Sequence, residues 1–539
     1  MRFLPIVSLG ATVVGTAIAQ SSFEPANFNI TEALLDLGID ESILIDLETA
    51  LDGNVGNLGK RTDPCSVACS TLRLVFGSSK LYTDDVLSYW SLISDDQTPK
   101  CTFKPTSALE VSKVVLISRL AQCPFAVKGG GHTGFAGASN IDGGITVSLE
   151  RLKAVDIKPN NIVEVGPGNR WVDVYTKLQS SNLAVVGGRA SSVGVPGFLL
   201  GGGVSHHINA RGFACDNIAA FEVVTSSGVI VKATPTLFAD LYWALRGGGG
   251  NFGIVTKFYL ETFQQGPVWG GTRRVSATEI PAVQQAFVNM ARNAAQDTKA
   301  TQLFGVSSVQ VGAGQRMNVA TFNLMYLEPV SNSSPPAILQ EYLDIPFTGD
   351  DFQQQSLVDN VVLLNENSPD GSRQYFWALP AIKLDLDMIR WMSDLFLSPG
   401  NTPSIDGVTP LVSLTFQAFT VPALQRMQRN GGNPLGIKAS DGPLFHCMIF
   451  YRWSGGPAED ARVNQATKAF EDKVVAEAKK RGLLTSYTYM NYAGPYAKVI
   501  EGYGATNNQR LKSIARVYDP TGVFQRLVPG GHKLEGSPL

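Results

Sequence analysis

Short apolar runs rich in Val and Ile alternate with helix-like spans and glycine clusters between about residues 100 and 265. Runs of this kind, bounded by turn residues, are typical of strands. They are "VVLIS", "FAVK", "GITVSL", "NIVEVGPG", "LAVVGG", "FEVVTSSGVIV" and "GIVTKFYLETF". In contrast, "NRWVDVYTKLQSSN" places Trp171, Val174, Tyr175 and Leu178 on one face of a helix. The alternation predicts a mixed unit of helices and sheet.

The pattern changes after about residue 266, where glycines become rarer and segments longer. "PLVSLTFQAFT" and "FHCMIFYRW" read as strands, and the last 55 residues return to a helix-and-turn pattern. In that last part, Asp519-Pro520 predicts the end of a helix. We therefore expect an α+β protein whose 539 residues bury at least one large core and form about two domains.

The charge of the chain narrows the kinds of partner that it could bind. The net charge is −2 and the pI about 6.3. Because no excess of Lys or Arg is available to neutralise phosphates, nucleic acid and anionic membrane surfaces are poor candidates for partners. A small neutral substrate fits better.

The N-terminus predicts secretion. "MRFLPIVSLGATVVGTAIAQ" has one Arg, a short apolar stretch and the small residues Ala17-Ile18-Ala19, so we predict a signal peptide over 1–19. Residues 20–61 form an acidic extension ending at Lys60-Arg61, either a propeptide released at a dibasic site or a surface helix with two solvated charges. Asn29 and Asn332 open glycosylation sequons.

Secretion would place the six cysteines in an oxidising compartment, where disulfides can form. Cys65, Cys69, Cys101 and Cys123 crowd the start of the first domain, where bridges would stabilise it. The connectivity is open, and Cys215 and Cys447 read as buried thiols. The cysteine spacing supports no metal site.

Three glycine-rich loops, at 127–144, 187–207 and 246–256, each lie beside an apolar strand. Gly129 to Gly134 formally match GxGxxG, but "FAGASNIDGG" follows, which is turn sequence and not the helix that a Rossmann site requires. Glycine loops can still hold phosphates through exposed backbone N–H groups. Three of them together favour a large, flat cofactor at close range over three ordinary turns.

"FAVKGGGHTGFAGASNIDGGITVSL", "GGRASSVGVPGFLLGGGVSHHINARGFACDNIAAFEVVTSSG" and "LYWALRGGGGNFGIVTKFYL" resemble the FAD-binding segments of PCMH-type (vanillyl-alcohol oxidase-like) flavoproteins. With "YTYMNY" and "YGATNNQRLKSIARVYDPTGVF", the chain is similar to the berberine-bridge-enzyme-like subgroup, particularly its secreted fungal members. The resemblance runs in motif order through nearly all of residues 65–530. It implies an FAD-binding domain over 62–265, an inserted α+β substrate domain with an antiparallel sheet over 266–484, and a segment over 485–539 that completes the flavin site.

The resemblance gives the histidine in the first loop a role. In this family it bonds covalently to the 8α-methyl carbon of FAD, and the matching residue is His132. A hydrogen-bonded loop histidine is the alternative. Members with two covalent bonds carry a Cys where this chain has Ala190, so we expect a single attachment.

Further cofactor contacts are implied by the same resemblance. Val193 matches a gatekeeper position at which valine accompanies access of dioxygen, which favours an oxidase. The pyrophosphate, the other side of the cofactor and the adenine end are expected to contact Gly129, Gly130, Gly131, Thr133, Gly194, Gly197, Gly201, Gly202, Gly203, Val204, His207, Ile254 and Val255.

The motif Tyr-x-Asn-Tyr at 489–492 matches the active-site signature of the family. In a strand, Tyr489 and Asn491 would share a face. We expect Tyr489 to be the catalytic base, helped by a positive neighbour or by hydrogen bonds to the phenolate, with Asn491 and Tyr492 at the isoalloxazine.

Other aromatic and histidine residues receive weaker expectations. Tyr487 and Tyr496 are interpreted as packing residues and His532 as a solvated tail residue. His446 and Tyr451 are alternative candidates for the catalytic role.

The resemblance implies a secreted, monomeric FAD oxidase. It would take hydride from an alcohol, amine or phenolic secondary metabolite and pass electrons to dioxygen to give hydrogen peroxide. Two alternatives are a carbohydrate oxidase of the same family and a non-catalytic secreted binding protein on this scaffold.

Overall fold

The computed structural model describes residues 23–52, 63–83, 85, 87–312, 315–331, 334–366, 368–398 and 411–535. The predicted signal peptide, Lys60-Arg61 and Asn332 lie outside these residues. Within them, no helix combines the length and apolar character that a membrane crossing requires.

The N-terminal half holds two small sheets. One has the order β1-β2-β4-β3, with parallel pairing of β4 to both β2 and β3. The other has the order β5-β6-β10-β8-β9 and is antiparallel throughout. The strands are β1 (Leu81–Tyr82), β2 (Cys101–Phe103), β3 (Phe125–Lys128), β4 (Ile145–Ser148), β5 (Val155–Lys158), β6 (Ile162–Val165), β8 (Ile218–Val224), β9 (Ile230–Ala233) and β10 (Ile254–Glu261), with β7 (Leu183–Ala184) and β11 (Phe263–Gln264) paired separately.

Helices of this half pack on the two sheets. The predicted amphipathic helix is confirmed as α6 (Trp171–Gln179), whose four apolar residues are all buried. The others include α3 (Pro64–Phe76), α4 (Leu92–Asp95), α5 (Ala108–Ala121), α7 (Val195–Leu200), α8 (Ile208–Arg211) and α9 (Ala239–Leu245).

The expectation that "VVLIS" forms a strand is wrong, because these residues lie inside α5. Ser107 caps the helix by accepting a hydrogen bond from the Glu110 N–H. The helix is buried nearly all round between α3 and the sheets, so it shows no polar face. A helix without amphipathic contrast cannot be distinguished from a buried strand by periodicity.

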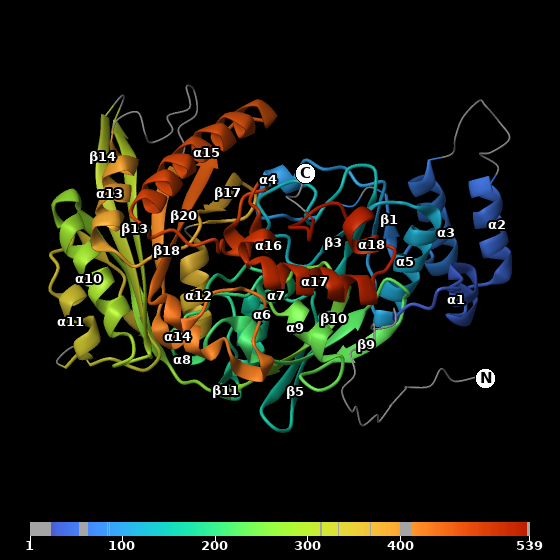
Figure 1. Cartoon of the computed structure of the whole chain (residues 1–539), viewed down its shortest axis with the longest axis horizontal. Helices are drawn as coiled ribbons and strands as arrows, with labels where there is room; N and C mark the ends of the chain where they lie inside the picture. The colour runs from blue at the N-terminus through green and yellow to red at the C-terminus, as the bar shows by residue number, and fades with distance from the viewer. Residues whose placement is uncertain are drawn as a thin grey trace.

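A nine-stranded antiparallel sheet dominates the second half, with β13, β14 and β20 at one end of the molecule in Figure 1. The two predicted strands are confirmed as β19 and β20. The strands are β12 (Val268–Ser276), β13 (Ala300–Gly312), β14 (Gln315–Tyr326), β15 (Gly349–Asp350), β16 (Gln353–Gln355), β17 (Arg373–Ala378), β18 (Ile382–Lys383), β19 (Leu411–Phe419) and β20 (Leu444–Trp453). Helices α10 (Ile280–Asn293), α11 (Ala337–Leu343), α13 (Leu386–Leu397) and α15 (Pro457–Lys480) pack on it, and α12 (Leu357–Glu366) lies against α6. The expected α+β class with an antiparallel sheet is confirmed.

The C-terminal segment returns to the first half. Helices α16 (Val499–Gly502), α17 (Ala505–Tyr518) and α18 (Val523–Arg526) follow the large sheet, while α14 (Val421–Arg426) links β19 to β20. Helix α17 ends at Tyr518 as Asp519-Pro520 predicted, because the Asp519 carboxylate turns to accept the N–H groups of Val523 and Phe524. This return places residues after 485 beside the glycine loops.

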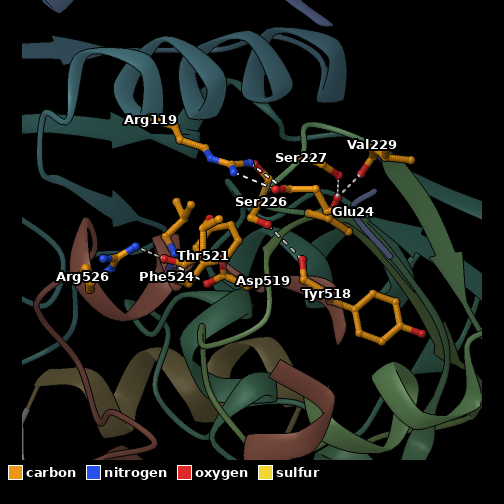
Figure 2. A network of polar contacts seen from close by, with 12 residues as sticks. Glu24, Arg119, Ser226, Ser227, Val229, Tyr518, Asp519, Thr521, Phe524 and Arg526 are labelled. Carbon is orange, nitrogen blue, oxygen red and sulfur yellow. Dashed lines mark hydrogen bonds and ion pairs between the residues drawn. The ribbon is translucent and has the colours of Figure 1, made fainter. Parts of the chain in front are cut away.

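The beginning of the described chain is anchored in the first half (Figure 2). The buried carboxylate of Glu24 accepts hydrogen bonds from Arg119 Nη1 (2.6 Å) and Nη2 (2.7 Å), and Phe23 N–H donates to the Val517 carbonyl. Helices α1 (Ile30–Asp36) and α2 (Glu41–Asp52) then pack near α5 and α3. The part of the extension that the structure describes is therefore a packed element.

Two disulfides join this region, Cys65–Cys123 and Cys69–Cys101. They tie α3 to the residues before β3 and to β2. Closing loops of 58 and 32 residues contributes about 4 kcal/mol each in the chain-entropy description. Cys215 and Cys447 are buried thiols, as expected.

Candidate active site

The first two glycine loops are in direct contact. A Cβ on Gly130 would lie 2.4 Å from Gly194 Cα, and one on Gly129 would lie 2.3 Å from Pro196 Cγ. No side chain fits at such distances, so glycine is required for this approach and not only for its conformational freedom. The loops thereby form one continuous wall.

C-terminal residues complete the enclosure. A Cβ on Gly201 would lie 1.8 Å from Asn491 Oδ1, which presses the 489–492 motif against the second loop. A Cβ on Gly530 would lie 1.7 Å from the Gly137 carbonyl oxygen, so the tail crosses the first loop. The third loop joins the tail through Asn251 Nδ2, which donates to the His532 carbonyl (2.8 Å).

The three loops and the C-terminal residues line a common cavity of about 350 Å³. This volume lies within the usual range of ligand pockets. The predicted site residues that line it are Gly129, Gly130, Gly131, His132, Thr133, Val193, Gly194, Gly197, Gly201, Val204, Ile254, Val255, Tyr489, Asn491 and Tyr492. The structure thus brings together segments more than 350 residues apart in sequence.

Gly202, Gly203 and His207 are not among the lining residues. Both glycines have positive φ, +106° and +79°, and turn the chain after α7. His207 Nε2 lies 3.0 Å from Gln265 Oε1, and its ring packs edge-on against Phe263. These three residues therefore lie outside the cavity wall, and their expected contact with a cofactor stays a prediction.

His132 is held against the ring of Trp90. Its imidazole stacks on Trp90 with centroids 4.5 Å apart, and Trp90 stacks in turn on Phe376. Burial lowers the pKa of His132 to about 4, which keeps the imidazole neutral. Its Nε2 is buried and has no hydrogen-bond partner. A neutral imidazole with an unpaired nitrogen is the form that can act as a nucleophile.

Residues 489–492 do not form a strand, in which Tyr489 and Asn491 would share a face: Met490–Tyr492 forms a 3-10 turn that Tyr489 precedes. Tyr489 and Asn491 nevertheless meet, since the tight turn brings the Asn491 amide back: Nδ2 donates to the Tyr489 hydroxyl oxygen (3.0 Å). The Val204 N–H donates to the same oxygen (2.9 Å). Tyr489 thus links the motif to the second loop.

The environment of Tyr489 is unfavourable for ionisation. Burial raises the pKa of its phenol above the ordinary value, and the ring of Tyr492 beside it acts in the same direction. The two donated hydrogen bonds offset this only in part. A resting base near neutral pH requires the opposite shift.

The arginine that lines the cavity, Arg189, contacts Tyr492 and not Tyr489. Arg189 Nη2 donates to the Tyr492 hydroxyl oxygen (3.0 Å) and to Gln417 Oε1 (2.7 Å). His446 is fully buried beside both tyrosines, and burial lowers its pKa to about 3. The immediate surroundings of Arg189 are therefore uncharged.

Tyr487 packs on Tyr503 as expected, whereas Tyr496 is 56% exposed. Tyr451 is buried against Tyr375 in the large sheet and does not line the cavity.

The expectation that His532 is a solvated tail residue is wrong. His532 is 9% exposed, lines the cavity and packs against Phe135, because the tail crosses the first loop. The adjacent Lys533 also lines the cavity; burial lowers its pKa to about 7, and its Nζ donates to the Phe524 carbonyl (2.9 Å). A helix-breaking tail with Gly530-Gly531 was the sequence signal for such a crossing.

Sequence reasoning also missed Trp90, Arg189 and Phe376. They come from separate elements, and no local motif marks them. Arg189 was visible next to Ala190 in the second loop, but its direction depends on the large sheet.

A family model described as an FAD binding domain matches residues 99–234. This range contains the first two glycine loops and most strands of the two small sheets.

Comparisons over the whole chain agree with this match. The FAD-dependent monooxygenase tpcD of Cochliobolus heterostrophus is 35% identical over 88% of this chain and 95% of its own length. Two solved structures share the fold, each with a TM-score of 0.66. Xylooligosaccharide oxidase of Myceliophthora thermophila is 22% identical and covers 84% of this chain and 95% of its own. Glucooligosaccharide oxidase of Acremonium strictum, described with a 6-S-cysteinyl, 8α-N1-histidyl FAD, is 20% identical and covers 81% and 92%.

Proposed function

Because the chain belongs to the PCMH-type FAD-linked oxidoreductases of the berberine-bridge-enzyme-like group, we propose that it is a secreted oxidase that takes hydride from a small organic metabolite. That it is an FAD-dependent oxidoreductase follows from the family. The observation that carries the finer proposal is the cavity in which the glycine wall, His132 and Tyr489 meet.

The residues present fit an FAD. The touching loops at Gly130 and Gly194 present backbone to the cavity where side chains would obstruct a diphosphate. Lys533 adds an amine whose pKa burial lowers to about 7, and an anionic cofactor beside it would favour its protonated form. The flavin, when bound, accepts the substrate hydride and returns the electrons to dioxygen.

His132 supports a covalent attachment, and the cysteines support a single one. The unpaired Nε2 and the neutral ring give His132 a nucleophilic nitrogen. Ala190 lines the cavity, while all six cysteines are either in disulfides or buried as thiols away from it. This arrangement provides no thiolate for a second bond.

Mass spectrometry of the denatured protein tests the attachment. The wild-type chain should carry the mass of one flavin, located on the peptide that contains His132. The His132→Ala variant should release its flavin on denaturation. Flavin that stays attached to the variant would refute the linkage.

At the reacting centre, the side chains position the substrate. Tyr489 keeps its proton, so its hydroxyl serves as a hydrogen-bond donor towards a substrate oxygen. Asn491 Nδ2 and the Val204 N–H fix the phenol by donating to its oxygen. This replaces the expected role of Tyr489 as a resting base, in agreement with the direction of its pKa.

A monooxygenase is the second candidate, because the relative tpcD carries that description. Val193 lines the cavity at the position that the family resemblance associates with dioxygen access, and both chemistries use dioxygen. The two reactions differ in the fate of its oxygen atoms. An oxidase yields one peroxide per product and incorporates no label from ¹⁸O₂, whereas a monooxygenase transfers one labelled atom to the product.

Peroxide assays over aromatic alcohols, phenols, amines and oligosaccharides would locate the substrate class. A protein that binds flavin but bleaches with no member of the panel would instead support the non-catalytic alternative.

Secretion is supported by the two disulfides, which persist in oxidising compartments. N-terminal sequencing of protein from culture medium should start after Ala19 if only the signal peptide is removed. A start after Arg61 would show that the extension is released as well.

A further inference from the structure

Arg189 differs from the other buried or half-buried arginines near the cavity in what it contacts. Arg170 pairs with Asp370 (3.0 Å), and Arg373 pairs with Asp460 and Asp96. Arg189, in contrast, has no carboxylate within ion-pair distance among the described residues. Its guanidinium donates to two neutral oxygens.

Both of these bonds come from the same nitrogen, Nη2. Nε and Nη1 therefore have no hydrogen-bond partner in the described part of the chain. A guanidinium offers five N–H donors in a planar fork that matches the two oxygens of a carboxylate. The unused donors belong to a side chain that lines the cavity beside Tyr489 and Tyr492.

The groups around Arg189 do not compensate its charge. His446 and His206 are buried and neutral, and the positive charge of Arg189 itself contributes to lowering their pKa values. Tyr489 is a protonated phenol, and Gln417 is an amide. Arg189 is only partly buried, so a ligand that fills the cavity would displace its water, and displacing water from a cation without supplying an anion is unfavourable. A ligand that supplies the missing anion would remove this cost.

The other residues of the cavity wall indicate what the remainder of such a ligand should be. Phe376 lines it together with the rings of the two tyrosines, while Trp90 supports this surface from behind, stacked on His132 and Phe376 and almost fully buried. Flat apolar surface next to one cation fits an aromatic or conjugated molecule that carries one acidic group. It does not fit a protonated amine, which Arg189 would repel, and a neutral sugar would leave its charge uncompensated.

We propose that Arg189 is a substrate-positioning residue that binds the carboxylate of an aromatic or conjugated acid. This inference rests on the proposed function and names the substrate class within it. Arg189 does not take part in hydride transfer. It fixes the orientation of the acid, so that the carbon to be oxidised faces the flavin wall.

Calorimetric titration of the flavin-loaded protein tests this, because binding is measured without turnover. The probes are a series of non-oxidisable aromatic carboxylates and their methyl esters. Hydrogen bonds to a charged partner give about a ten- to hundredfold preference for the acid over its ester. Arg189→Met should abolish this preference, Arg189→Lys should retain part of it, and Arg170→Met, whose arginine already has a carboxylate partner, should leave it unchanged.

Three results would overturn the proposal. One is equal binding of acid and ester by the wild-type protein. Another is a preference that survives in Arg189→Met. The third is an Arg189-dependent preference shown only by phenolates, which would move the recognised oxygen to a different functional group.

The outcome is distinguishable from failure of the proposed function. A protein that carries no flavin, or whose flavin no substrate reduces, contradicts the oxidase. Loss of acid selectivity in Arg189→Met with intact flavin absorbance supports the inference even where no substrate reduces the flavin. With an oxidisable acid as substrate, the same variant should raise KM far more than it lowers kcat, because the lost contact acts on binding.

Discussion

The cavity has two unlike walls. The glycine wall, made by the loops around Gly130 and Gly194, presents backbone and fixes its shape by contacts too close for any Cβ. The rest of the wall presents side chains, among them Tyr492, Phe376 and Arg189, which projects from the start of the second loop to Tyr492 and Gln417. The first wall suits a constant group such as a cofactor, whereas the second can vary with the substrate. Selectivity should therefore change through the second wall without loss of flavin.

The largest effect is expected from filling the glycine wall. Gly130→Ala puts a methyl group 2.4 Å from Gly194 Cα, so the two loops must separate. We expect most of the flavin to be lost, measured as the ratio of flavin to protein absorbance in the purified variant. Gly266→Ala is the control, because a Cβ there meets nothing within 4 Å. Full flavin content in Gly130→Ala would show that the two loops can accommodate the methyl group without losing the cofactor.

Acid should destabilise the folded protein as a whole, including both parts of the cavity wall. Burial lowers the pKa of all five histidines in the fold: His132, His207 and His532 to about 4, His446 to about 3, and His206 well below 6.5. The unfolded chain binds these protons more readily, so stability is complete above about pH 6.5 and is lost as the pH falls towards 4. Each histidine should cost on the order of 1 to 2 kcal/mol by pH 5.

Four carboxyls oppose this trend, because burial raises the pKa of Asp95, Glu471 and Asp519 as well as that of Asp216. Burial raises the pKa of Asp216 to about 6, so its protonation favours the fold as the pH falls from 6 towards 3.8. The five histidines outweigh these four carboxyls, which predicts a lower melting temperature at pH 5.0 than at pH 7.5. An unchanged melting temperature would mean that the histidines are hydrated in solution.

Much of the glycine wall could be predicted from sequence because its residues are contiguous. Gly129 to Thr133 follow β3 directly, and the absence of a helix after them was readable from "FAGASNIDGG". The second wall could not be predicted in this way. Trp90 and Phe376 are brought together by packing of the large sheet against the first half, and nothing in their local sequence encodes that meeting.

Two errors have a similar physical origin. The uniformly buried α5 removed the periodic signal that separates a helix from a strand. His532 lies near the chain end, where solvation is the ordinary expectation, but the close crossing of Gly530 over Gly137 buries it. In both cases long-range packing decided the environment.

A smaller effect is expected at Tyr489, where the walls meet. Tyr489→Phe removes a hydroxyl that accepts two hydrogen bonds and belongs to a side chain that lines the cavity. As a donor to substrate oxygen, this hydroxyl should be worth about ten- to hundredfold in the rate of anaerobic flavin reduction. A loss near ten-thousandfold would restore Tyr489 to the role of proton acceptor. The flavin content should stay normal in either case.

The smallest effect is expected behind the glycine wall. His207→Gln should leave the flavin spectrum and the reduction rate unchanged, because His207 contacts Gln265 and Phe263 and does not line the cavity. The altered hydrogen bond should cost about 1 kcal/mol of stability, measured by denaturant unfolding. His532→Gln is the matched comparison, since His532 does line the cavity and its replacement should shift the flavin spectrum. A spectral change in His207→Gln equal to that in His532→Gln would contradict this prediction. It would mean that residues behind the cavity wall influence the cofactor as strongly as those that line it.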